Sequence, residues 1–151
     1  MKNPNAKDRD VSQQLYLPTS DTSQLRPLRR ILSARDVWNE LVDLRAERQE
    51  HFVALDLSVR HSIIARRIVH IGTLVGVEVH PREVFRGAIL NSAAAMIIAH
   101  NHPSGDPTPS CQDIELTLRL REVAELCGIP ILDHVVVAVD GYISLAARDW
   151  H

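Results

Sequence analysis

The stretch AAAMIIAHNHPSGDPTPSCQD, at residues 93–113, decides the fold that we expect for this chain. Its first part, 93–100, is a short and almost continuously apolar run, which is typical of a central strand buried on both faces. The segment 101–109 is rich in Pro, Gly, Asp and Asn, and these residues favour turns. A helix is expected to begin at Ser110, so the stretch predicts a buried strand, a loop and a helix in succession.

The segments on either side extend this pattern of alternating helices and strands. An apolar stripe formed by Val37, Leu41 and Leu44 predicts an amphipathic helix. The expected elements are a helix over 33–49, a hairpin of strands over 51–58 and 62–72, a helix over 80–92, a strand over 93–100, a helix over 110–130, and two strands joined by an Asp-Gly turn within 131–147. Helices that alternate with buried strands predict a layered α/β domain.

Four residues mark where these helices should begin and end. Ser33 begins one helix with an acidic residue three positions later, which is a capping-box spacing. Pro81 suits a first helical turn, and Ser110 suits an N-cap. Gly128 is expected to end the last helix, since glycine adopts the left-handed conformation that often follows a helix.

The chain is long enough for one domain with a hydrophobic core, at 151 residues of which 45% are hydrophobic. Residues 1–30 are polar and lack periodicity, so we expect a flexible N-terminal arm followed by a single domain over 31–151. No internal repeat is visible in the sequence.

The net charge and the cysteine content limit which cellular compartments and which binding partners we expect. A net charge of −2, from 17 basic and 19 acidic residues, gives no electrostatic footprint for nucleic acid or for a membrane surface. Cys111 and Cys127 are too few for a disulfide framework, so a reducing compartment fits. No signal core or membrane-length apolar run is present, and we therefore expect a soluble, cytoplasmic protein.

His100 and His102 lie two residues apart at the exit of the predicted strand. Side chains at this spacing share one face of a strand, so both rings should reach the same point. Two neutral imidazoles that converge in this way suit a zinc ion. The alternative is that both are loop histidines hydrogen-bonded to the backbone. Asn101 points the opposite way, and we assign it no chemistry.

Asp113 lies three residues before the apolar stripe of the last helix, which we place at Leu116, Leu120, Val123 and Cys127. It should therefore point toward the core, where a carboxylate is costly unless it is paired or binds a cation. Ser110 and Asp113 also have the spacing of a capping box. The two roles are compatible, because one carboxylate oxygen can serve each.

These residues together have the spacing His-x-His, seven residues, Ser, two residues, Asp, and this pattern resembles the JAB/MPN (JAMM) metalloprotein family. The words GTL, HPREVF, HNHPSGDPTPS, DIELTLRL and LDHVVV are similar to its RadC branch, and the resemblance covers about residues 34–146. It implies a single deaminase-like layered domain, with a mixed β-sheet packed between helices. It also implies a zinc site with His100, His102 and Asp113 as ligands. Three such ligands leave a fourth position open for water, which is catalytic rather than structural coordination.

The resemblance also implies a catalytic glutamate at the start of the strand after the first helix, and Glu50 matches that place. Glu83 is the alternative general base, although a first-turn glutamate is already explained by the helix dipole. Ser110 is expected to stabilise the oxyanion of a tetrahedral intermediate, and an N-cap is its other reading. His134 and Asp133 match words of the family, and we interpret them as structural residues or as residues behind the ligands.

The resulting prediction is a Zn²⁺-dependent hydrolase that cleaves peptide or isopeptide bonds. Its partner would be a peptide or protein substrate, of which a ubiquitin-like conjugate is one option, and the sequence names no specificity pocket or oligomeric state. The alternatives are a DNA-repair-associated RadC-like accessory protein and an inactive, metal-stabilised interaction module. The letters HNH at 100–102 do not indicate an HNH nuclease, because that motif's residues are dispersed over a ββα-metal unit.

Overall fold

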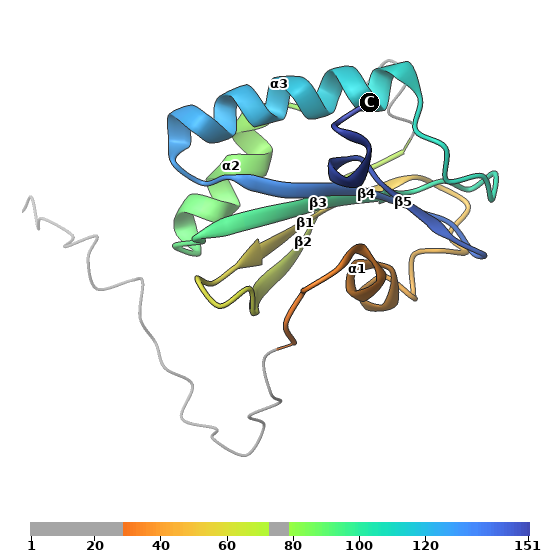
Figure 1. Cartoon of the computed structure of the whole chain (residues 1–151), viewed down its shortest axis with the longest axis horizontal. Coiled ribbons are helices and arrows are strands. Elements are labelled where there is room, and N and C mark those ends of the chain that lie inside the picture. The colour runs from red at the N-terminus through yellow and green to blue at the C-terminus, as the bar shows by residue number, and fades with distance from the viewer. Residues whose placement is uncertain (1–28, 73–78) are drawn as a thin grey trace, which may run out of the picture.

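The computed structural model describes residues 29–72 and 79–151, and Figure 1 shows their arrangement. The elements are α1 (Ala34–Glu40), β1 (His51–Leu57), β2 (Ile63–Ile71), α2 (Pro81–Leu90), β3 (Ala95–Asn101), α3 (Cys111–Cys127), β4 (Ile131–Val137), β5 (Tyr142–Ser144) and a 3₁₀ turn (Ala146–Arg148). Nearly all of the arm predicted over 1–30, and most of the GTL word, lie outside the described residues. Within those residues, no helix has both the length and the apolar composition that crossing a bilayer requires.

The strands form one five-stranded sheet in the order β2-β1-β3-β4-β5. β1 runs antiparallel to both β2 and β3, whereas β3 and β4 are parallel and α3 makes the crossover between them. β5 returns antiparallel to β4 after the Asp-Gly turn. The sheet is therefore mixed, and the predicted α/β class is confirmed.

Helices cover both faces of this sheet. In Figure 1, α2 and α3 lie on one face and α1 lies on the other. Successive residues of β1 alternate between two cores, with Phe52 and Ala54 facing α2 and α3 and Val53 and Leu55 facing α1. All of β1 and all of β3 are buried, as expected of central strands covered on both sides.

The predicted helix ends are largely confirmed. Ser33 forms a capping box with the acidic residue three positions later, and Pro81 occupies the first turn of α2. Ser110 forms a second capping box at the start of α3. Gly128 ends α3 in the left-handed conformation, with φ of 67°, which a residue without a Cβ adopts without strain.

The first helix is shorter than predicted: it ends at Glu40, whereas the sequence predicted an end near residue 49. Leu41 and Leu44 are nevertheless buried with Val37, as the stripe predicted. The Leu44 N–H donates to the Leu41 carbonyl, and the Glu47 N–H donates to the Leu44 carbonyl. These bonds span three residues, so the chain continues in turns that keep a side chain facing the core every third position.

The buried face of α3 also differs from the predicted stripe. Leu120 is buried as expected, but Cys127 is exposed and Leu116 is only partly buried. The fully buried row instead contains Thr117 and Ala124 on either side of Leu120. The buried row therefore includes a polar threonine and a small alanine, which the pattern of large apolar residues alone does not reveal.

A buried ion pair ties β1 and β2 to α2. The Asp56 side chain is fully buried, and its two oxygens accept hydrogen bonds from Arg67 at 2.7 Å each. Asn91 Nδ2 donates to the same carboxylate at 2.7 Å, and Arg67 also donates to the Val84 carbonyl at 2.9 Å. The carboxylate is thus satisfied on both oxygens, as a buried charge requires.

Gly87 provides the space for this guanidinium, since a Cβ at that position would collide with the Arg67 side chain. We expect Gly87→Ala to lower the free energy of unfolding by about 2 kcal/mol, the usual cost of overpacking. An exposed helical glycine would show the opposite sign, because alanine has the higher helix propensity. Urea unfolding measures whether the substitution lowers or raises the free energy of unfolding. Ile89→Ala, on the exposed side of the same helix, is the control and should change little.

Candidate metal site

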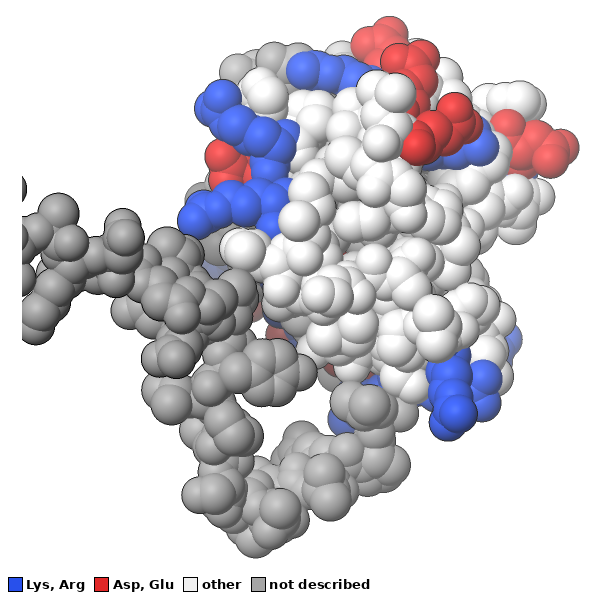
Figure 2. Space-filling view, turned by 90° about the vertical axis from the view of Figure 1, so that its left-hand side faces the viewer, with Lys and Arg blue, Asp and Glu red and all other residues white. Residues whose placement is uncertain are grey.

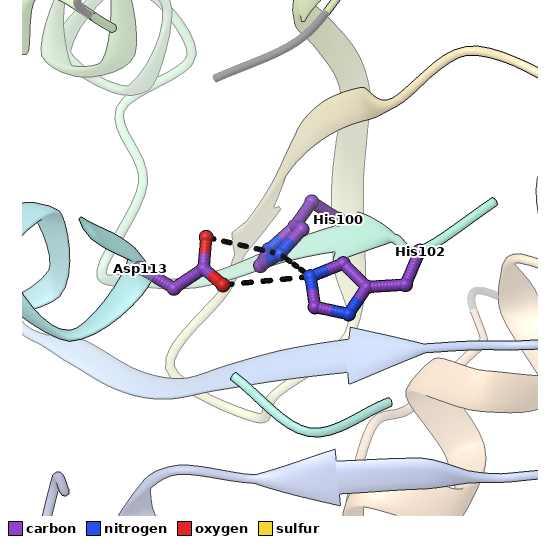
Figure 3. A group of neighbouring side chains, drawn as sticks. All are labelled: His100, His102 and Asp113. Atoms are coloured by element: carbon purple, nitrogen blue, oxygen red, sulfur yellow. Dashed lines mark hydrogen bonds and ion pairs between the residues drawn. The ribbon is translucent and has the colours of Figure 1, made fainter. Parts of the chain in front are cut away.

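The side chains of His100, His102 and Asp113 meet at one point, as Figure 3 shows. The Nε2 atoms of the two histidines are 2.9 Å apart. Asp113 Oδ1 lies 3.3 Å from His100 Nε2, and Asp113 Oδ2 lies 3.4 Å from His102 Nε2. The predicted convergence of these three side chains is therefore present.

The strand and the helix that follows it explain this convergence. His100 is fully buried on the face of β3 that packs against α3, and Phe52 is its partner across the antiparallel ladder. The His102 N–H donates to the Val137 carbonyl, so the chain continues as an extension of the parallel pairing and the two histidines share a face. Asp113 lies in the first turn of α3 and is 3% exposed, pointing inward as predicted.

Asp113 divides its oxygens between two tasks. Oδ2 accepts from the Ser110 N–H at 2.7 Å and from the Ser110 hydroxyl at 2.8 Å, which completes the capping box. Oδ1 faces the His100 ring, with Nε2 at 3.3 Å. The Ser110 hydroxyl is engaged with Asp113 in this arrangement, so its N-cap role is observed and its oxyanion role stays a prediction.

The hydrogen bond made by His102 Nδ1 determines whether His102 Nε2 carries a hydrogen. Nδ1 lies 2.8 Å from the Asp106 carbonyl, which can only accept, so Nδ1 carries the hydrogen. In the neutral ring Nε2 then presents a lone pair toward His100 and Asp113. Two imidazole nitrogens and a carboxylate thus surround one point, and a positive charge at that point would be stabilised.

The electrostatics of the group reflect this concentration of bases. Burial alone would raise the pKa of the Asp113 carboxyl, but its contacts with His100 and His102 hold that pKa well below its usual range. Burial alone would lower the pKa of His102, yet Asp113, the Asp106 carbonyl and Glu50 together raise it. Both shifts show that the group favours positive charge at its centre. The three side chains can hold a metal ion there.

Glu50 lies at the same site. It lines a hollow of about 240 Å³ together with His102, Pro103, Ser104, Ser110, Gln112 and Asp113. The antiparallel pairing of β1 with β3 runs up to Phe52 and His100, which lie two residues from Glu50 and His102 in the sequence. Glu83 lies elsewhere: it is exposed, pairs with Arg82 at 3.2 Å and lines a different hollow.

Asn101 has a structural role that the sequence analysis did not assign to it. Its Oδ1 accepts from the His51 N–H at 2.7 Å, and its Nδ2 donates to the Gln49 carbonyl at 3.0 Å and to the Glu47 carbonyl at 3.3 Å. The side chain thus fixes the backbone on both sides of Glu50. The residue between the two histidines points away from them, as predicted, and positions the adjacent strand.

His134 and Thr117 lie behind His100. His134 is fully buried, and its Nε2 is 2.8 Å from His100 Nδ1. Thr117 is also fully buried and contacts His134 Nδ1 through its hydroxyl at 2.5 Å. Burial lowers the pKa of His134 well below its ordinary value. The interpretation of His134 as a residue behind the ligands agrees with this geometry, whereas Thr117 was missed although its four-residue spacing from Asp113 puts both on one helix face.

The mixed sheet, the helices on both of its faces and the His-His-Asp group at the end of a central strand define a JAB-type α/β domain. A sequence profile of the RadC-like JAB domain matches residues 31–150. The chain belongs to the RadC-like JAB family.

Relatives of this chain share the name UPF0758 protein. One from Desulforamulus reducens is 51% identical over 106 residues, which is 70% of this chain and 47% of the relative. One from Shouchella clausii is 41% identical over 145 residues, which is 95% of this chain and 63% of the relative. One from Methanococcoides burtonii is 42% identical over 137 residues, which is 90% of this chain and 58% of the relative. The chain thus spans about half to two thirds of the length of these relatives.

Proposed function

We propose that this domain is a zinc-dependent hydrolase of amide bonds in peptides or proteins. The observation that carries the proposal is the convergence of two imidazole nitrogens and one carboxylate at the edge of a hollow that Glu50 also lines. The two Nε2 atoms are 2.9 Å apart, each lies 3.3–3.4 Å from a different oxygen of Asp113, and one ligand atom from each residue lies within 4.8 Å of the others. Two ligand atoms of a tetrahedral zinc ion with bonds of 2.0–2.1 Å lie about 3.3 Å apart, so this donor set fits zinc.

Each residue then has a distinct task in the proposed reaction. His100, His102 and Asp113 would hold the ion, which when bound supplies a Lewis acid that polarises a carbonyl and acidifies a water. Glu50 would accept the proton of the attacking water and deliver it to the leaving amine. Ser110 would support the oxyanion once its hydroxyl turns from Asp113 toward the substrate.

The role of Glu50 is tested by comparing two glutamate variants. We expect Glu50→Gln to lower metal-dependent cleavage at least about 100-fold, since a positioned general base contributes that much or more. Glu83→Gln is the matched control and should keep the wild-type rate, because Glu83 lies outside the hollow. Cleavage is followed as new N-termini in a mixed peptide library, after zinc is removed and restored. Equal rates for Glu50→Gln and wild type would overturn this assignment.

The nucleic-acid alternative gains no support from the surface that Figure 2 shows. On that face the basic side chains lie in separate groups, with uncharged and acidic surface between them. A DNA-binding face would present a continuous basic stripe. The inactive module is distinguished by the experiment above, since it would bind zinc and cleave nothing in the library.

A further inference from the structure

We propose that His134 and Thr117 are positioning residues that fix the tautomer of His100, so that its Nε2 presents a lone pair to the metal. The inference rests on the metal site proposed above. It adds which residues hold His100 in the tautomer that can bind the metal. It is carried by a chain of three hydrogen bonds among side chains buried between α3 and the sheet.

The direction of this chain is set by the backbone carbonyl of Asp113. Thr117 Oγ1 lies 2.5 Å from that oxygen, and the hydroxyl must donate because a carbonyl has no hydrogen to give. The hydroxyl has a single hydrogen, so it accepts in its other contact, with His134 Nδ1 at 2.5 Å. His134 therefore carries its hydrogen on Nδ1.

The same reasoning continues from His134 to His100. His134 is fully buried, which favours the neutral ring, so its Nε2 has no hydrogen. His100 Nδ1 lies 2.8 Å away and must donate to it. His100 Nε2 is then free of hydrogen and faces Asp113 Oδ1 at 3.3 Å. We call the hydrogen-bonded series Asp113 carbonyl, Thr117, His134 and His100 the relay. It starts at the main chain of Asp113 and ends opposite the side chain of the same residue.

Phe52 holds the two rings of the relay in place. It stacks on His100, with ring centroids 6.3 Å apart and planes 15° apart. It meets His134 edge-on, with centroids 5.7 Å apart and planes 73° apart. The rings are therefore held at a fixed mutual angle, and the hydrogen-bond direction is the remaining variable. If Thr117 instead donated to His134, its bond to the Asp113 carbonyl would be lost and the bond between the two rings would reverse. A hydrogen on His100 Nε2 would then occupy the metal position.

The tautomers are read directly by long-range ¹H–¹⁵N NMR of the zinc-free protein near neutral pH. We expect the hydrogen on Nδ1 in both His100 and His134. Thr117→Val keeps the shape but removes the hydroxyl, so His134 loses its acceptor and His100 should shift toward the Nε2–H form. Thr117→Ser keeps the hydroxyl and should retain the wild-type tautomers.

Zinc affinity gives the second readout. We expect Thr117→Val to raise the zinc Kd about 10- to 100-fold, the usual effect of losing a partner behind a metal-bound histidine. Thr117→Ser should keep an affinity close to wild type. In a second pair, His134→Gln offers an amide oxygen to His100 and should bind zinc more tightly than His134→Phe, which offers none.

The outcomes separate this inference from the proposed function. A hydrogen on Nε2 of His100 in the wild-type protein would overturn the relay, even if zinc binds. Wild-type tautomers and affinity in Thr117→Val would overturn it as well. Nδ1–H on both rings in a protein that binds no zinc would support the relay and contradict the metal site.

Discussion

Replacing His102 with Ala is expected to weaken zinc binding about 100- to 1000-fold, since three side chains and a water would share a binding free energy of roughly 10–16 kcal/mol. The fold should survive, because His102 lies at the exit of β3 and its outer nitrogen bonds only the Asp106 carbonyl among the contacts described. Competition with a chelator measures the affinity.

The thermal midpoint provides an independent measure of the same change. Zinc binds only the folded site, so it should raise the Tm of the wild type with increasing concentration and leave His102→Ala unchanged. His151→Ala removes an exposed histidine at the C-terminus and serves as the control, with a wild-type response to zinc. An equal zinc-induced rise in Tm for His102→Ala and wild type would contradict the assignment of this ligand.

Much of the fold could be predicted because local signals and tertiary packing agree. The run at 93–100 is apolar on both faces and became a central strand, and the capping boxes begin helices where they were expected. The length of α1 could not be predicted, because three-residue spacing of Leu41 and Leu44 suits a helix and a series of turns equally well. The buried face of α3 was also misplaced, since its buried row includes Thr117, whose hydroxyl bonds the Asp113 carbonyl and His134.

The convergence of three side chains at the candidate site could be predicted, whereas the contacts of Asn101 and Thr117 could not, and His134 was placed behind the site only by its match to the family. His100 and His102 share a strand face by a local rule, and Asp113 follows from helix periodicity. Asn101 acts on a segment 50 residues away in sequence, and His134 acts on His100 across a parallel pair 34 residues apart. Such contacts depend on strand order and register, which the sequence of one strand does not contain.

Arg67→Met is expected to lower the free energy of unfolding by about 3–5 kcal/mol, the typical cost of breaking a buried pair by removing one partner. Methionine retains most of the side-chain volume, so packing changes little. The Asp56 carboxylate, fully buried, would keep Asn91 as its one side-chain donor in the described contacts. Urea unfolding gives the free energy. The same loss should lower Tm by roughly 10 °C, at about 2–4 °C per kcal/mol for a chain of this size.

The neighbouring residue offers a matched control. Arg66 pairs with Asp43 at 2.7 Å, the same distance as the buried pair, but the Asp43 side chain is 58% exposed. Arg66→Met should therefore cost less than about 1 kcal/mol, because water replaces the lost partner. Adding Asp56→Asn to Arg67→Met removes the unpaired charge, keeps an oxygen for Asn91, and should recover more than half of the loss. Equal costs for Arg66→Met and Arg67→Met would show that burial of the carboxylate does not set the energetics of this pair.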